Sequence, residues 1–427
     1  MRAVGNDLQV VDEKIRDFVS KWEGLELYDP SMNEELIQFV RSISMDSGGM
    51  EIAYDLSPNF ENHLLIGGDD YLVFVWRNQQ HDIVGTGSFT RRTGRMGDRA
   101  VQVGYFGGLR LSPRMERRQR VHWRKQYGEL IELLSGGESS FSVDVIYTAI
   151  LNKNIAAVKA LTNSKQFSYV PVTSYHSYSL VLSGLSGIFK YFQKPSSFHV
   201  RKANESDSSK LANWIADREK VSRFSVYHDG RQTLGEGLEE NLSTNSELSS
   251  STHELSRRME RWKGFKIPGF YLVETGEGEL VGSCAPYFED SGRHLMVEKV
   301  PKHLKMASKW MRLWGRPSLE QGKPLRLLYL SHFYVDENLS SVEKVDVIMA
   351  VLDTIIETPE YAQSHSTTFI PPAIFSQQEI DMMKHKLQRI GAVIHAEAGT
   401  IYQVTCDSTR VRLKPSDWST NLEPCVI

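Results

Sequence analysis

The stretch VQVGYFGGLRLSPRMERRQRV, residues 101–121, carries the strongest signal for the fold of this protein. Its first half is apolar and β-rich, and Gly107 and Gly108 predict a bulge or a close approach of the backbone. After Pro113 the pattern changes to that of a helix, which we expect to end near Leu134. The stretch therefore predicts a strand that leads through a short turn into a long helix.

The turn and the first turns of this helix concentrate positive charge. Glu116 is the only acid among seven basic residues, which are Arg110, Arg114, Arg117, Arg118, Arg120, Arg124 and Lys125. Unsatisfied N–H groups and the helix dipole attract anions to a helix N-terminus, and arginine binds phosphate oxygens in a bidentate fork. The pattern predicts an anion-binding turn, and a solvated basic helix face is the alternative.

The remaining elements repeat in the same order in the two halves of the chain. In the first half we expect helices and strands at 8–23, 33–43, 71–76, 83–89, 141–150, 154–161 and 169–182. In the second half we expect them at 198–202, 206–218, 270–274, 279–285, 325–335, 342–357, 367–370, 376–390 and 393–405. We therefore predict two domains of the same fold, residues 1–195 and 196–427, each with its own sheet and a boundary near Lys194.

Length and composition agree with two globular domains. The chain has 427 residues, 24% of them charged, and its formal net charge of −3 gives no reason to expect nucleic acid as a partner. The cysteines, Cys284, Cys406 and Cys425, form no metal-binding spacing, so we expect no metal site and a reducing, cytoplasmic location. The charged N-terminus does not look like a signal peptide, and we expect no membrane span.

The element order resembles that of the GNAT family of N-acetyltransferases, whose hairpin often carries an (I/L)-V-G signature. Ile83-Val84-Gly85 and Leu280-Val281-Gly282 occupy corresponding places in the two halves. The resemblance implies an α/β fold of two tandem GNAT-like domains, each a mixed, mainly antiparallel sheet flanked by helices. It also implies that acyl-coenzyme A, such as acetyl-CoA, lies between two parallel strands as a substrate.

The resemblance also implies which residues bind the coenzyme. The segment 105–109 would lie beside the thioester, and an N-x-x-A pattern opens the helix along the pantetheine arm at Asn154. The implied cofactor-binding residues are Leu109, Arg110, Leu111, Arg117, Arg118, Gln119, Arg120, Val121 and Asn154. The chain departs from the family at Gln119 and Val121, where glycine is preferred, and at Leu161, where many members have the tyrosine that protonates the thiolate.

No catalytic residue is assigned by the sequence. Candidate general bases for deprotonating an amine are Glu51, Asp55, Glu61, Asp69, Asp70 and Asp144, and spacing selects none of them. Tyr147, Tyr169, Tyr175 and Tyr178 are nearby tyrosines, which we expect to pack within strands.

The second half departs further from the family. Asp336 and Glu337 stand where a pyrophosphate would bind, and like charge there opposes binding. We therefore expect a degenerate second domain. The serine-rich segment 241–256 predicts a surface loop, and 299–314 predicts an amphipathic helix that packs on its own sheet or lies on a membrane or partner.

Two functions follow from these observations. The first is an acyl-CoA-dependent N-acyltransferase that acts on an amine of a small molecule or a protein. The second is a non-catalytic GNAT-like module that senses a phosphate-bearing ligand, such as a nucleotide, through the arginine-rich turn.

Overall fold

The structure is a computed structural model of the chain. It describes residues 12–47, 49–68, 70–97, 99–137, 139–164, 166–182, 197–221, 224–225, 267–288, 293–313, 318–361, 364–369, 375–389, 392–406 and 413–414. The predicted loop at 241–256 and the predicted boundary at Lys194 lie outside these residues.

The elements of the first half match the predicted order and add several short ones. They are α1 (Glu13–Ser20), β1 (Leu25–Leu27), η1 (Pro30–Met32), α2 (Asn33–Arg41), β2 (Met45–Ser47), β3 (Met50–Asp55), α3 (Asn62–Gly67), β4 (Asp70–Arg77), β5 (Ile83–Met96), β6 (Arg99–Leu111), α4 (Arg117–Ser135), β7 (Val145–Leu151), α5 (Ile155–Thr162) and β8 (Ser168–Leu182). The strand, turn and helix predicted from residues 101–121 are therefore confirmed as β6 and α4.

The second half follows the same course. Its elements are β9 (His199–Lys202), η2 (Glu205–Asp207), α7 (Ser208–Val221), β10 (Phe224–Ser225), η3 (Ile267–Gly269), β11 (Tyr271–Glu274), β12 (Leu280–Phe288), β13 (His294–Lys299), α9 (Lys302–Leu313), β14 (Pro324–Leu325), β15 (Leu327–Val335), α10 (Ser341–Glu357), η4 (Pro359–Tyr361), β16 (Ser366–Phe369), α11 (Gln377–Arg389) and β17 (Ala392–Thr405).

The main sheet has a mirrored strand order. Within the described residues it contains 13 strands, twelve of them in the order β1-β4-β5-β6-β7-β17-β8-β16-β15-β12-β11-β9, with β10 beside β5. From either end inward, three antiparallel pairings are followed by one parallel pairing, β6 with β7 and β15 with β16. The expected mixed, mainly antiparallel sheet flanked by helices is confirmed.

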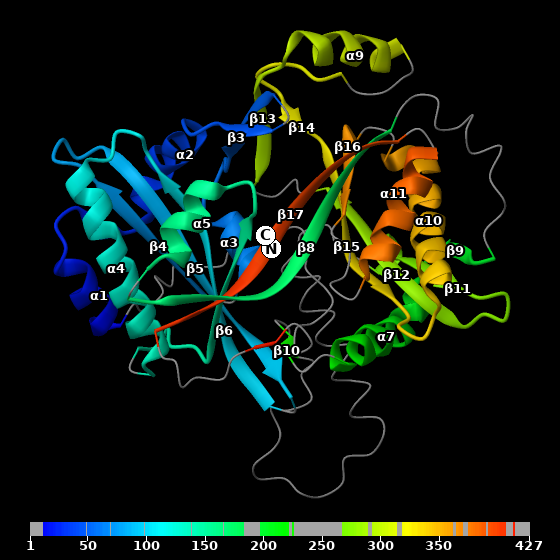
Figure 1. The fold of residues 1–427 in the computed structure, drawn as a ribbon, viewed down its shortest axis with the longest axis horizontal. Helices are drawn as coiled ribbons and strands as arrows, with labels where there is room; N and C mark the ends of the chain where they lie inside the picture. The colour runs from blue at the N-terminus through cyan, green and yellow to red at the C-terminus, as the bar shows by residue number, and fades with distance from the viewer. Residues whose placement is uncertain are drawn as a thin grey trace, which may run out of the picture.

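The two long central strands are exchanged between the halves. The last strand of the chain, β17, pairs with β7 of the first half, whereas β8 of the first half pairs with β16 of the second. The two strands also pair antiparallel with each other and run side by side through the centre of the molecule (Figure 1). Our expectation of a separate sheet in each half is therefore wrong, because each half completes the sheet edge of the other.

Helices cover the sheet in separate groups. In the first half α1, α4 and α5 pack against the strands through a core that includes Phe18, Phe106 and Ile131. Helices α2 and α3 pack on the opposite face of β4, around Leu36 and Val73. In the second half, α10 and α11 share a further core (Figure 1).

A third contact joins the halves, which sequence reasoning missed. A small second sheet has the order β14-β13-β3-β2, in which β13 of the second half pairs antiparallel with β3 of the first. This pairing brings His294 opposite Asp55 and so places the neighbouring Arg293 beside the α2–α3 side of the first half.

The amphipathic helix predicted in 299–314 is α9, which stands away from the main sheet in Figure 1. Its Met306 and Leu313 are 65% and 77% exposed. The alternative in which its apolar side chains all pack against the sheet is therefore wrong for these two residues.

Local hydrogen bonds define helix starts. The Asp12 carboxylate caps α1 by accepting the Ile15 N–H at 3.0 Å and also accepts the Ser139 hydroxyl at 2.7 Å. Burial raises the pKa of Asp12, but the hydrogen bonds from Ser139, Ile15 and Ser140 outweigh it and lower that pKa to about 2. The start of α1 is thus tied to the loop that precedes β7.

Candidate functional site

The parallel strands β6 and β7 separate in the middle of their length. They pair through Val103, Gly104 and Tyr105, and the register ends at the Tyr105–Tyr147 pair although both strands continue. Just beyond it, the buried Thr148 hydroxyl donates to the Phe106 carbonyl at 2.8 Å. Beyond Phe106, the backbone of β6 is therefore not paired with β7.

A bulge lies in β6 at the same level. The register with β5 passes from Ser88–Gly107 to Thr86–Arg110, so Gly87 faces both Gly108 and Leu109. Gly108 has φ +62°, and a Cβ there would lie 2.9 Å from the Ser88 Oγ. The glycine is needed because other residues rarely adopt this conformation. The bulge turns β6 just where it parts from β7.

The predicted anion-binding turn connects this bulge to α4. Arg114, Arg117, Arg118 and Arg120 are exposed, and none of them forms an ion pair with the acids of the described residues. The Arg120 guanidinium donates to the Pro113 carbonyl at 2.8 Å, which holds the turn together. Three arginines thus remain available for an anion at the helix start.

Gln119, a site residue predicted from the sequence, and its neighbour Glu116 have structural partners instead. Glu116 is the N-cap of α4 and forms a capping box with Gln119, whose Oε1 accepts the Glu116 N–H at 3.2 Å. The Gln119 side chain also donates to the Arg77 carbonyl at 3.0 Å. Because the Glu116 carboxylate already accepts the Gln119 N–H, the arginine side chains are the main ligands that this turn offers an anion.

Asn154 caps α5, because its Oδ1 accepts the Ala157 N–H at 3.1 Å. This bond accounts physically for the N-x-x-A spacing. Leu161, at the position where the family has a tyrosine, is buried in the core with α4. It cannot donate a proton.

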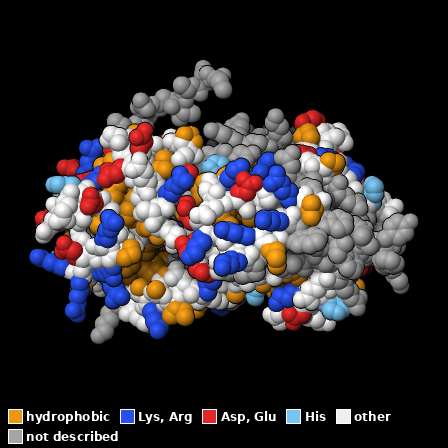
Figure 2. Space-filling view, turned by 90° about the horizontal axis from the view of Figure 1, so that it is seen from above, with side chains coloured by type: hydrophobic (Ala, Val, Ile, Leu, Met, Phe, Trp, Pro, Cys, Tyr) orange, Lys and Arg blue, Asp and Glu red, His pale blue; other side chains and the backbone are white. Residues whose placement is uncertain are grey.

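Apolar side chains lie at the end of β6 and near the starts of α4 and α5. Leu109 and Leu111 are partly buried there against the core below α4. Val121 and Ile155, near the starts of these two helices, are 63% and 60% exposed. In the view from above (Figure 2), hydrophobic side chains on the left lie recessed and are bordered by Lys and Arg side chains.

Arg110 lies on the other face of β6 from Leu109 and Leu111. Its guanidinium stacks over the Tyr54 ring of β3 at 4.9 Å, and Arg293 approaches the same ring at 5.9 Å. The structure therefore does not bring Arg110 together with the arginines of α4. Sequence reasoning missed Tyr54 and Arg293, which reach this place only through the pairing of β3 with β13.

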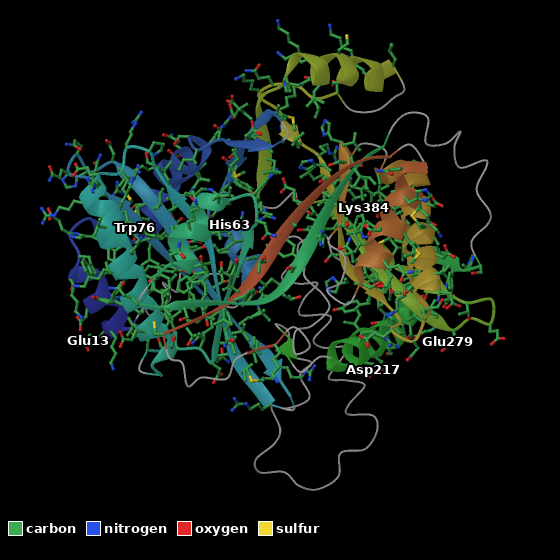
Figure 3. All side chains as sticks on the ribbon, in the orientation of Figure 1. Glu13, His63, Trp76, Asp217, Glu279 and Lys384 are labelled. Atoms are coloured by element: carbon green, nitrogen blue, oxygen red, sulfur yellow. The ribbon has the colours of Figure 1, made fainter. Side chains whose placement is uncertain are left out.

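His63, labelled in Figure 3, belongs to α3 and lies near Arg110 and Arg293. Burial, followed by the charges of Arg293 and Arg110, lowers the pKa of His63 to about 3. The imidazole is therefore neutral near pH 7 and donates from Nδ1 to the Phe60 carbonyl.

Tyrosines surround the point where β6 and β7 part. Tyr105 and Tyr147 lie 5.0 Å apart between ring centroids, and burial raises the pKa of each hydroxyl. Burial also raises the pKa of Tyr175 to about 12, and its buried hydroxyl has no hydrogen-bond partner among the residues that the structure describes. Tyr169 instead pairs with Tyr127 at 2.7 Å below α4. The hydroxyls near the strand junction are therefore protonated donors near pH 7.

The candidate bases have other partners or lie elsewhere. Asp144 is exposed and accepts the Gln102 N–H at 2.7 Å, as expected for an outward-facing residue. Glu51 pairs with Lys299 at 2.7 Å, Asp55 with Arg41 at 3.3 Å, and Asp70 with Arg91. Glu61 lies close enough to Tyr71 that its charge, together with the larger effect of burial, raises the pKa of that tyrosine. Asp69 lies outside the described residues.

The corresponding place in the second half is closed. Ser340 and Glu343 form a capping box at the start of α10, and the preceding Asp336 is buried in a bidentate pair with Arg218 at 3.1 and 3.3 Å. Asp336, which was predicted to oppose an anion, therefore serves local structure through its pair with Arg218.

The described residues contain neither a metal-binding cluster nor a membrane-spanning helix. Within the described ranges, no three His, Cys, Asp or Glu side chains gather closely enough to hold a metal ion. Across the same residues, no helix combines the length and apolar character needed to cross a membrane.

Comparison with solved structures identifies the fold. Saccharomyces cerevisiae N-myristoyltransferase with bound myristoyl-CoA and inhibitors aligns with a TM-score of 0.51 and 10% identity, over 94% of this chain and 84% of that chain. A structure of the same enzyme with bound myristoyl-CoA aligns with a TM-score of 0.50 and 10% identity, over 92% and 84%. No protein-family model and no curated protein matches the sequence. The likeness shows that this chain shares its mixed α/β fold with those solved structures.

Proposed function

We propose that this protein is an acyl-CoA-dependent N-acyltransferase whose acyl-CoA lies between β6 and β7. The parting of these strands after Tyr105 and Tyr147 is the observation that carries the proposal. It leaves strand backbone free to pair with the amides of a pantetheine arm, beside the bulge at Gly108. The reaction would proceed by attack of an amine on the thioester carbonyl, with backbone N–H groups stabilising the oxyanion.

In this proposal the coenzyme phosphates bind Arg117 and Arg118, with Arg114 beside them. Leu109, Leu111 and Val121 contact the pantetheine arm, and the cap at Asn154 holds the start of α5 beside it. The partners around Gln119 and Glu116 make these two residues supports of the turn rather than phosphate ligands.

We further propose that the chain is a tandem of two GNAT-like units, divided near residue 195, with a degenerate second unit. The repeated order of strand pairings supports the tandem. The closed start of α10 supports loss of coenzyme binding in the second unit. Because β17 completes the sheet of the first unit, we do not expect residues 1–195 to bind acyl-CoA alone.

The runner-up function is a non-catalytic module that senses a phosphate-bearing ligand such as a nucleotide. Leu161 favours it, because the described site then lacks the tyrosine that would protonate a departing thiolate at that position. The same arginines would bind the nucleotide phosphates.

A thiol-release assay on the full chain tests the leading proposal. Acetyl-, octanoyl- and myristoyl-CoA are each incubated with a panel of amines and peptides, and free coenzyme A is measured. We expect release that depends on both the acyl-CoA and an amine. Calorimetric binding of ATP or GTP, with no binding of coenzyme A, would contradict the enzyme and support the sensor.

A further inference from the structure

Arg110 is a partly buried cation that forms no ion pair with an acid of the described ranges. Its Nη1 donates to the Leu109 carbonyl at 3.3 Å, and its guanidinium lies over the Tyr54 ring at 4.9 Å. Its Nε is buried and has no hydrogen-bond acceptor among the described residues. A buried charged donor without an acceptor is costly, so this geometry indicates that a bound group supplies the acceptor.

The free edge of this guanidinium suits one kind of group. With Nη1 engaged by the backbone, Nε and Nη2 present two parallel N–H donors on the opposite edge. Two parallel donors match the two oxygens of a planar carboxylate. Contact with the Tyr54 ring restricts the guanidinium, which lowers the entropy lost when a carboxylate binds.

The surroundings of Arg110 are positive and contain further donors. Arg293 also lies over the Tyr54 ring, 5.9 Å from its centroid. The neutral His63 adds no negative charge. The buried Tyr175 hydroxyl has no hydrogen-bond partner in the described part of the chain, and it is close enough to Tyr54 for electrostatic interaction. An anion is therefore the ligand that this group of residues would favour.

The position of Arg110 connects it to the reaction. It directly follows segment 105–109, beside which the thioester would lie, but it projects to the face opposite Leu109 and α4. A ligand held by Arg110 would therefore meet the acyl group from the face opposite the coenzyme phosphates. That is the direction from which an amine must approach without displacing the coenzyme.

We propose that Arg110 binds a carboxylate of the amine acceptor, so that the acceptor is an amino acid or another carboxylate-bearing amine. This inference rests on the proposed acyl transfer for the role of the bound compound. The carboxylate site itself is testable without any reaction.

The test is calorimetry on the full chain, with and without saturating coenzyme A. The twenty amino acids are compared with their α-carboxamides, and O-phosphoethanolamine is compared with ethanolamine. We expect at least one amino acid to bind at least tenfold more tightly than its amide. We expect Arg110→Gln to weaken that binding about ten- to a hundredfold and Arg110→Lys to restore it only partly.

Arg99→Gln is the matched control, because Arg99 is an exposed arginine at the other end of β6. It should bind every compound as wild type does. Equal binding of acids and amides, equal binding by Arg110→Gln, or a preference for the phosphate compound would overturn the carboxylate proposal. Coenzyme A titrated separately reports on the proposed function, so a failure there is distinguished from a failure at Arg110.

Discussion

His332 in β15 occupies the position that Gly108 occupies in β6. Each is the first of two residues that face a single residue of the neighbouring strand, and each has positive φ, +47° for His332 and +62° for Gly108. The His332 side chain is fully buried, with its ring 5.6 Å from that of Phe270. The same bulge is therefore exposed at Gly108 in the first half and buried at His332 in the second.

This relationship predicts that Gly108→Ala lowers both stability and coenzyme binding. The Cβ would meet the Ser88 Oγ at 2.9 Å, and positive φ disfavours alanine, so we expect a loss of about 1–2 kcal/mol in unfolding free energy. Chemical denaturation checks the stability, and titration with coenzyme A checks the binding. Gly137→Ala, at a positive-φ glycine with open space around it, separates backbone strain from the contact. Unchanged coenzyme affinity in Gly108→Ala would contradict the role of the bulge.

The exchanged strand predicts that a core substitution in β17 destabilises the first half. Ile401 is fully buried and faces Ala149 of β7 and Thr173 of β8. Ile401→Ala should cost about 2–5 kcal/mol and reduce hydrogen-exchange protection in β7. His395→Ala, at an exposed position of β17, should change stability by less than about 0.5 kcal/mol. Protection of β7 that survives Ile401→Ala would argue against the exchange.

His63 predicts a dependence of stability on acid. Its pKa is lowered to about 3 in the folded protein, whereas an unfolded histidine has about 6.5, so the unfolded state binds the proton more readily. Stability should therefore fall as pH drops below about 6.5, by about 1–2 kcal/mol at pH 5 relative to pH 7.5. His63→Gln should remove this part of the loss. If the unfolding free energies of wild type and His63→Gln fall equally as the pH is lowered, His63 does not titrate in this way.

The sequence predicted the local elements well, because hydrophobic period and turn residues act over short distances. Residues 101–121 folded as expected, as a strand, a turn and a helix. The exchange of β8 and β17 could not be predicted, because the same alternating pattern suits either neighbouring strand. The group at Arg110 was missed for a similar reason: Arg293 reaches Tyr54 through a pairing across 240 residues of sequence, and no local signal marks it.

The sequence analysis grouped Arg110 with the arginines of α4, but the structure places it on the opposite face of β6. Strand alternation would have assigned the faces of β6 directly, but the bulge at Gly108 changes the alternation between Tyr105 and Arg110. The charge of Arg110 was visible in the sequence, and the face on which it lies was not.

Calorimetric titration of the full chain with coenzyme A tests the central claim most directly. Wild type should bind, and Arg117→Ala and Arg118→Ala should each weaken binding by about 1.5–3 kcal/mol, which is about ten- to a hundredfold, with unchanged melting in the absence of ligand. Arg99→Ala, an exposed arginine far from the turn, should bind as wild type does. If wild type does not bind coenzyme A, or if both α4 variants bind it as tightly as wild type, coenzyme phosphates do not occupy this turn and the account is contradicted.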